Sequence, residues 1–125
     1  MEENAFLEAA ESGDMIDVKQ RLQHGEDVDT SDEHNRTALM KAAKHGHLNV
    51  VQVLLEHGAD VNIRDNRGTN ALYWASNNGH DEIVQLLVQH HSDVSVVDNR
   101  GWSAKDQASV KHHDHIVHVL EDAGA

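Results

Sequence analysis

Small and apolar residues of this chain recur at intervals of 33 positions. One series of alanines and one of valines keep this interval: Ala9, Ala42, Ala75 and Ala108, and Val18, Val51, Val84 and Val117. Two glycine series keep it as well, each with a histidine in one position: Gly13, Gly46, Gly79 and His112, and Gly25, Gly58, His91 and Gly124. Because several independent series share one period, the chain is predicted to consist of repeated structural units.

The apolar pattern within one unit, residues 32–64, predicts two short helices. Thr37 suits the N-cap of the first helix because its hydroxyl accepts a hydrogen bond from an amide of the first turn. Gly46 and Gly58 follow the two apolar stretches, and glycine favours the left-handed conformation that ends a helix. The first apolar face is narrow and the second is wider: Leu39, Ala42 and Ala43, then Val50, Val51, Val53, Leu54 and Leu55.

This unit resembles the ankyrin repeat, and the resemblance covers essentially the whole chain. The clearest unit contains Ala42-Ala43, Gly46-His47, Val51, Leu54-Leu55 and Gly58-Ala59-Asp60-Val61-Asn62. The resemblance implies an all-α solenoid of four stacked helix-turn-helix repeats of 33 residues, joined by β-turn or hairpin connections. The expected organisation is a single domain over 1–125, with an N-terminal cap repeat over 1–31, repeats over 32–64 and 65–97, and a C-terminal cap repeat over 98–125.

The helix-opening Thr-Pro-Leu-His motif of the family is altered in this chain. The three corresponding segments read Thr37-Ala38-Leu39-Met40, Asn70-Ala71-Leu72-Tyr73 and Ser103-Ala104-Lys105-Asp106. Thr, Asn and Ser all cap helices, so each first helix is expected to begin as the family pattern requires. Lys105 stands where leucine is usual, and its aliphatic stem is expected to lie along the core while its ammonium reaches water.

Polar residues replace apolar ones in the first and last repeats. A stack of repeats needs polar outer faces at its ends, so these replacements are expected to mark the caps. Gln20 and Arg21 take the positions of Val53 and Leu54, and Gln107 and Glu121 take those of Trp74 and Val88.

Composition narrows the function classes. Ten Lys and Arg against 22 Asp and Glu give a formal charge of −12, which opposes binding to nucleic acid and to anionic membranes. The absence of Cys excludes a disulfide scaffold, a thiol nucleophile and a thiolate metal site. The acidic start at residues 1–4 does not resemble a signal peptide, and the apolar stretches are too short to span a bilayer. The expected location is the cytoplasm.

No catalytic motif is present, so the chain is not expected to be an enzyme and no cofactor is predicted. The glycines lie at predicted helix ends, and neither a phosphate-binding loop nor a G-x-S-x-G or H-E-x-x-H motif occurs. Asp27, Asp60 and Asp93 follow the repeat and are expected to accept hydrogen bonds from their own turns.

Histidines are abundant, with 12 in the chain. His47, His80 and His113 share one repeat position, where the family usually has a structural histidine. Four histidines cluster in the last repeat, at His112, His113, His115 and His118. The i, i+3 spacing of His115 and His118 allows weak chelation of a transition metal or a pH response, whereas alignment with Asn49 and Gln52 places both on a solvated outer face. No metal site is assigned, and a metal- or pH-sensing protein is the alternative function.

The resemblance also implies where a partner binds. Ankyrin partners usually meet the turn tips and the exposed side of the first helices, which together form a concave groove. The candidate partner-binding residues are Arg36, Lys41, Lys44, Arg64, Asn66, Arg67, Trp74, Asn77, Asn78, Asn99, Arg100 and Trp102. Seven of the ten Lys and Arg residues fall on this surface when Lys111 is included, which predicts a basic groove on an acidic protein.

Three further expectations concern this groove. The aspartates that start the repeats, Asp32, Asp65 and Asp98, are expected to form hydrogen bonds within their own turns, which leaves the groove basic. Trp102 and Trp74 are expected to be apolar anchors for a partner, since Trp and Arg dominate binding hot spots, with a core position as the alternative for Trp74. The predicted function is a small inhibitor, immunity factor or adaptor that is monomeric when free and binds a protein with an acidic or polar epitope.

Overall fold

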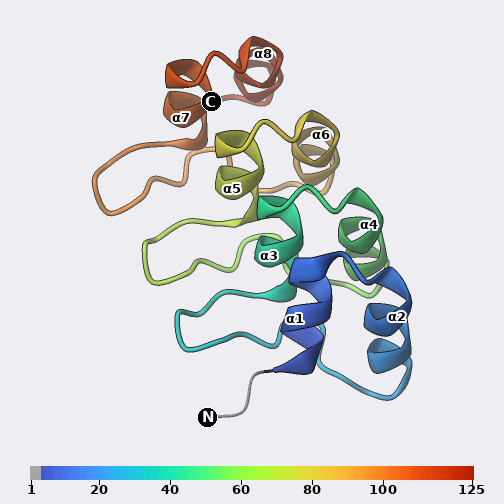
Figure 1. Cartoon of the computed structure of the whole chain (residues 1–125). Coiled ribbons are helices and arrows are strands. Elements are labelled where there is room, and N and C mark those ends of the chain that lie inside the picture. The colour runs from blue at the N-terminus through green and yellow to red at the C-terminus, as the bar shows by residue number, and fades with distance from the viewer. Residues whose placement is uncertain (1–3) are drawn as a thin grey trace.

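The computed structural model describes residues 4–125 and contains, within them, eight α-helices in four pairs (Figure 1). The helices are α1 (Ala5–Ser12), α2 (Met15–Gln23), α3 (Ala38–Lys44), α4 (Leu48–Glu56), α5 (Ala71–Asn77), α6 (Asp81–Gln89), α7 (Ala104–Val110) and α8 (Asp114–Asp122). The all-α architecture of stacked helix pairs is confirmed. The acidic start of the chain, residues 1–3, lies outside the described residues.

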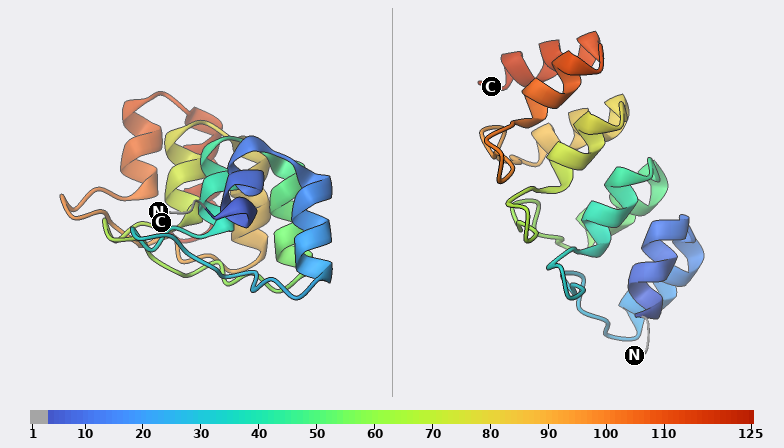
Figure 2. Two further views of the ribbon diagram at one scale, coloured as in Figure 1. Left: turned by 60° about the horizontal axis from the view of Figure 1, so that its bottom comes forward. Right: turned by 60° about the vertical axis from the view of Figure 1, so that its left-hand side comes forward.

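The pairs stack in sequence order, so the odd-numbered helices form an inner row and the even-numbered helices an outer row (Figures 1 and 2). The long connections before α3, α5 and α7 project to the same side as hairpin-like loops. Isolated antiparallel bridges between Ser31 and Thr37 and between Val97 and Ser103 close two of these loops. The inner helices and the loops together form the surface on which the candidate residues lie.

The inner helices begin at the expected N-caps. The side chains of Thr37, Asn70 and Ser103 each accept a hydrogen bond from the amide three residues later, at 3.3, 3.0 and 3.1 Å respectively. Ser103 also forms a full capping box, because its own amide donates to the carboxylate of Asp106. The N-caps are thus kept although alanine stands where the family has the proline that favours the first helical position.

Left-handed residues end the helices at the positions that the repeat predicts. Gly46 has φ 77° and Gly58 has φ 81°, and the two histidines in the glycine series adopt the same conformation, with φ 65° at His91 and φ 62° at His112. The repeat register therefore fixes the backbone even where the side chain is poorly suited to it.

The core is a column of small side chains between the inner helices. Ala42, Ala75 and Ala108 are fully buried in α3, α5 and α7, and α5 packs against both of the other two helices. Larger aliphatic side chains, among them Leu54 and Leu87, fill the space between the inner and outer rows. This distribution follows the narrow and wide apolar faces of the sequence.

Polar bonds connect neighbouring repeats along the outer edge. The carboxylates of Asp60 and Asp93 accept amides of their own turns at 2.9 Å, as expected. Their backbone amides in turn donate to the preceding repeat, that of Asp60 to Asp29 at 3.0 Å and that of Asp93 to Asn62 at 2.9 Å. Each turn is thus held both internally and to its neighbour.

The repeated histidines form a second set of contacts between repeats. The Nε2 atoms of His47 and His80 lie 2.8 and 3.0 Å from the carbonyl oxygens of Glu11 and Lys44 in the preceding repeats. The His80 ring lies so close to Gly46 that a Cβ at that glycine would come within 2.7 Å of it. These histidines have the structural role that the resemblance implies.

Two residues of the last repeat differ from simple cap positions. Gln107, expected on a polar outer face, is instead buried, and its amide donates to the Tyr73 hydroxyl at 3.0 Å. The hydroxyl of Tyr73 extends into this position and offers an acceptor, so a polar side chain is favoured there. Lys105 is half-buried, and its ammonium lies 3.4 Å from the carboxylate of Glu121.

Candidate functional site

The aspartates at the repeat starts organise the loops that border the groove. Asp98 accepts the amides of Arg100 and Trp102 at 2.9 and 3.0 Å through one oxygen and the hydroxyl of Tyr73 at 2.7 Å through the other. Asp65 accepts the amides of Arg67 and Thr69, both at 3.0 Å, in the same way. The expectation that these carboxylates bond within their own turns is confirmed, and both also bind residues outside them.

These bonds hold Asp98 in its charged form. Burial alone raises the pKa of a carboxyl group, but the Trp102 amide, the Tyr73 hydroxyl, and the amide and charge of Arg100 outweigh it and lower the pKa of Asp98 from 3.8 to about 2. The pKa of Asp65 is also lowered, because hydrogen bonds from Thr69, Arg67 and Arg36 outweigh the effect of its burial. Negative charge therefore lies beneath the cations of the groove.

A lowered pKa predicts a defined pH dependence of stability. Since Asp98 has a lower pKa folded than unfolded, its contribution is complete above about pH 4 and is lost as the pH falls toward 2. Asp98→Asn is expected to lower the free energy of unfolding by about 1–2 kcal/mol at pH 7. Urea unfolding at pH 7, 4, 3 and 2 should show the difference from wild type shrinking with acidity. The exposed Asp122→Asn variant is the control, and a pH-independent difference for Asp98→Asn would contradict the assignment.

Most cations of the chain are neutralised by the protein itself. Six of the ten Lys and Arg residues lie within 4.0 Å of a carboxylate: Arg21 with Asp17, Arg36 with Asp65, Lys41 with Asp32, Arg64 with Asp93, Arg100 with Asp98 and Lys105 with Glu121. Within residues 4–125, the other four have no carboxylate partner: Lys19, Lys44, Arg67 and Lys111. Three of these four, Lys44, Arg67 and Lys111, line the groove. The groove therefore has three cations without a carboxylate partner in residues 4–125, fewer than the seven cations counted from sequence.

Trp74 lies at the floor of this basic region. Its ring centroid is 5.1 Å from the Lys44 ammonium, 5.6 Å from the Arg36 guanidinium and 6.0 Å from the Arg67 guanidinium. The indole N–H donates to Asp65 at 3.3 Å. Trp74 is only 8% exposed, which corrects the expectation of an exposed apolar anchor at this position. The ring instead supports three cations through cation–π contacts.

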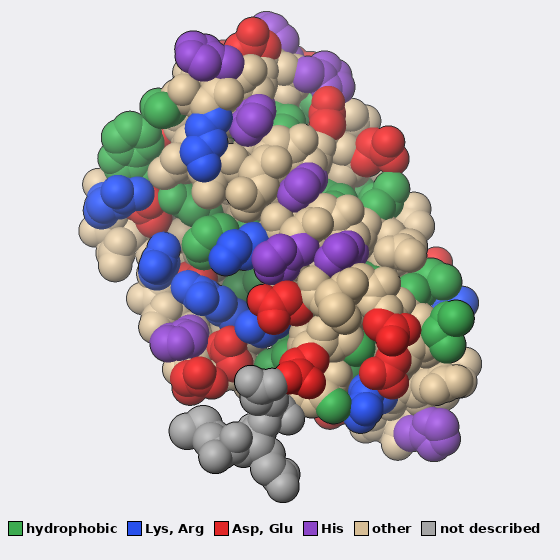
Figure 3. Space-filling view, viewed as in Figure 1, with side chains coloured by type: hydrophobic (Ala, Val, Ile, Leu, Met, Phe, Trp, Pro, Cys, Tyr) green, Lys and Arg blue, Asp and Glu red, His purple; other side chains and the backbone are tan. Residues whose placement is uncertain are grey.

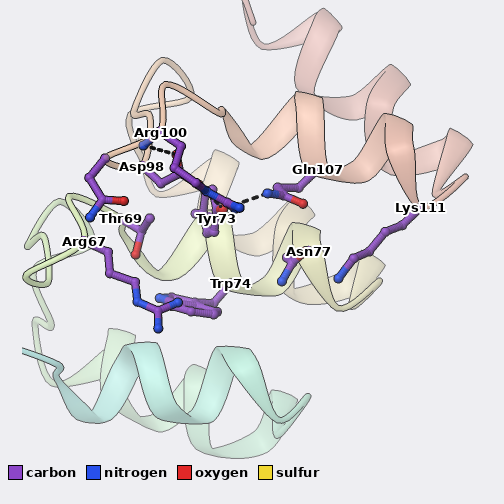
Figure 4. A pocket seen from close by; sticks show the side chains of 10 residues that line it. Arg67, Thr69, Tyr73, Trp74, Asn77, Asp98, Arg100, Gln107 and Lys111 are labelled. Carbon is purple, nitrogen blue, oxygen red and sulfur yellow. Dashed lines mark hydrogen bonds and ion pairs between the residues drawn. The ribbon is translucent and has the colours of Figure 1, made fainter.

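A cleft of about 540 Å³ opens between the third and fourth repeats (Figure 4). Arg67, Arg100 and Lys111 approach it from different sides, and Lys111 extends toward Asn77. The Oδ1 atom of Asn77 is buried, and no group among residues 4–125 forms a hydrogen bond to it. The cleft therefore offers unpaired cations and an unpaired acceptor within one hollow.

The other expected site residues are placed differently. Asn99 and Arg100 line the cleft, and Trp102, 39% exposed, lines an adjoining hollow of about 390 Å³. Three others bind within the chain: Lys41 bonds Asp32 at 3.0 Å, Asn66 contacts the His34 ring at 3.3 Å, and Asn78 donates to the Trp74 carbonyl at 2.9 Å. Arg64 pairs with Asp93 at 3.6 Å and does not line the cleft.

Five cleft residues were not among the predicted site residues: Thr69, Tyr73, Asp98, Gln107 and Lys111. Tyr73 and Gln107 line the cleft and are joined by a hydrogen bond across the repeat boundary. The available signal was the replacement of the family histidine by tyrosine at position 73, which puts a long hydroxyl-bearing side chain at the start of α5. Its partner 34 residues later is fixed only by the stacking.

The space-filling view shows where charge gathers. Lys and Arg side chains cluster over the loops and the inner helices, and acidic side chains lie toward the N-terminal end and over the outer-helix side of the same face (Figure 3). Glu11 of α1 pairs with His45 at 3.4 Å. The groove thus changes along its length from acidic to basic.

The last-repeat histidines lie away from this cleft. His115 and His118 are exposed on α8, where His115 contacts Asp81 of the third repeat and His118 lies 3.6 Å from Glu121. Across residues 4–125, no three His, Cys, Asp or Glu side chains come together in a way that would hold a metal ion. In the same part of the chain, no helix combines the length and apolarity needed to cross a membrane.

Comparison with known proteins gives one match. A family model described as ankyrin repeats (many copies) matches residues 22–73 and 54–106. No curated protein matches the chain. The two matched ranges span the end of the first repeat, the second and third repeats, and the beginning of the fourth.

Proposed function

Because the chain belongs to the ankyrin repeat family, we propose that it is a non-catalytic module whose groove binds another protein. Ankyrin repeats generally bind proteins and typically carry no catalysis of their own. In this proposal residues 1–125 act as a single cytoplasmic unit, monomeric when free, that serves as an inhibitor, immunity factor or adaptor. The epitope of the partner is acidic or polar.

The observation that carries the proposal is the position of the unpaired cations. Lys44, Arg67 and Lys111 have no carboxylate partner in residues 4–125, although the chain has a formal charge of −12. A cation without a partner lowers its free energy most when a complementary group approaches, so this region attracts an acidic surface. The net negative charge argues against nucleic acid as that surface.

The metal- or pH-sensing alternative has weaker support. His47 and His80 form contacts between repeats, and His115 and His118 are each beside a carboxylate on the outer helix. These contacts stabilise the stack, and they explain the histidines without a binding function.

The proposal is tested by exchanging one charge in the groove and one outside it. The wild-type chain captures its partner from an extract of the cells that produce it, and the purified partner is titrated against two variants. Arg67→Glu is expected to weaken binding at least tenfold, because it removes a free cation and adds a repulsive charge. Lys19→Glu changes the net charge equally on α2 and should bind within about twofold of wild type. Equal loss in both variants would reject the groove as the binding surface.

A further inference from the structure

The groove changes chemical character once more at its C-terminal end. The equivalent inner-helix positions in the four repeats are Glu11, Lys44, Asn77 and Val110. Val110 is 59% exposed, and with Trp102 and Arg100 it lines the hollow of about 390 Å³ next to the cleft. A basic cleft and an apolar hollow therefore lie side by side, since Arg100 lines both.

The exposed apolar residues lie where the groove meets the end of the stack. Asp106 and Ser109 also line their hollow, and the equivalent residues of the third repeat, Tyr73 and Ser76, are buried. Trp102 and Val110 are 39% and 59% exposed, so an occupant of the groove that extends to this end would cover them.

The cleft itself selects among anionic occupants. Arg67 and Lys111 have no carboxylate partner within residues 4–125 and favour acceptors, whereas the buried Oδ1 atom of Asn77 requires a donor. A polypeptide provides both, through a carboxylate side chain and backbone N–H groups. A fully deprotonated anion such as sulfate provides only acceptors and would leave Asn77 unpaired.

Resting on the proposed function, we infer that the groove recognises an extended partner segment carrying an acidic residue and a bulky apolar residue close together in sequence. The carboxylate lies in the cleft among Arg67, Arg100 and Lys111, and the apolar side chain fills the hollow between Trp102 and Val110. Arg100 lines both hollows, so the two side chains of the segment are neighbours in space. Arginine favours carboxylate because its planar fork matches the two oxygens.

A peptide library tests this inference directly. The full chain is immobilised and a library of random twelve-residue peptides is selected against it. The enriched peptides are expected to share Glu or Asp within a few positions of Leu, Ile, Phe or Trp, in either order. A synthetic peptide with the enriched motif then serves as the probe in titrations.

Two double variants separate the halves of the motif. Arg67→Glu with Lys111→Glu should weaken the probe at least tenfold, and a Glu→Gln change in the peptide should then have no further effect, although it costs wild type at least tenfold. Trp102→Ser with Val110→Ser should remove the preference for the apolar residue and keep that for the acid. Melting curves verify folding, and Lys111→Ala and Trp102→Ala replace any variant that fails to fold.

The outcomes also separate this inference from the broader proposal. Peptides that depend on the groove variants but lack the two-residue motif overturn the inference alone, as does a selection that enriches nothing over the blank matrix. The same holds if the Glu→Gln effect persists unchanged in the Arg67→Glu, Lys111→Glu chain. Peptides that bind all groove variants normally and are lost when His115 and His118 are changed overturn the groove proposal as well.

Discussion

Replacing Ala75 by leucine is expected to lower the free energy of unfolding by about 1–3 kcal/mol. Ala75 is 0% exposed at the centre of α5, and this helix packs on α3 and α7, whose equivalent positions are Ala42 and Ala108. The three additional carbon atoms of leucine would push α5 away from both α3 and α7. The close approach of the inner helices depends on small side chains, so the stack cannot accept them without displacement.

Urea unfolding of Ala75→Leu beside wild type measures this cost. Gln52→Leu is the matched control, because it introduces the same side chain at an exposed position in the middle of α4. The control is expected to remain within about 0.5 kcal/mol of wild type. An unfolding midpoint of Ala75→Leu equal to that of the control would contradict the repeat register.

The fold could be predicted from sequence because each structural feature recurs in the repeat. The N-caps at Thr37, Asn70 and Ser103 differ in chemistry but perform the same function at the same position. His91 and His112 adopt positive φ because they occupy glycine positions, which no local preference of histidine would indicate. Because the same structural feature occurs in several repeats, a single atypical residue does not change the architecture.

The details of the site could not be predicted in the same way. The register places Trp74 on the groove side of α5, but its exposure depends on how Arg36, Lys44 and Arg67 fold over the ring. Long cationic side chains adopt many rotamers, and their choice is decided by partners in other repeats, such as Asp65 for Arg36. Sequence position therefore gives the surface on which a residue lies and not its contacts.

Ion pairs between repeats also depend on how the repeats stack. They reduce the number of cations that are available to a partner. Arg36 and Asp65 are 29 residues apart in sequence and come within 3.4 Å only when the loops stack. The cations that remain unpaired were not distinguishable from the paired ones before the geometry was known. Two of the unpaired cations, Arg67 and Lys111, meet at the boundary of the third and fourth repeats.

Removing Arg100 and Trp102 together is expected to weaken partner binding by about 2 kcal/mol or more, roughly thirtyfold. Arg100 is exposed and lines both hollows, and Trp102 is the exposed aromatic residue beside it. The bonds that shape their loop come from their backbone amides to Asp98, so alanine at both positions leaves those bonds in place. The loss should therefore appear in affinity, with little change in the melting temperature.

The measurement that tests the groove most directly is a pair of titrations of the captured partner. One uses Arg100→Ala with Trp102→Ala, and the other uses His115→Ala with His118→Ala on the exposed side of α8. The account predicts a loss of roughly thirtyfold for the first variant and wild-type affinity for the second. A normal affinity for the Arg100 and Trp102 variant together with a loss for the histidine variant would place the binding surface on the outer helices and contradict the account.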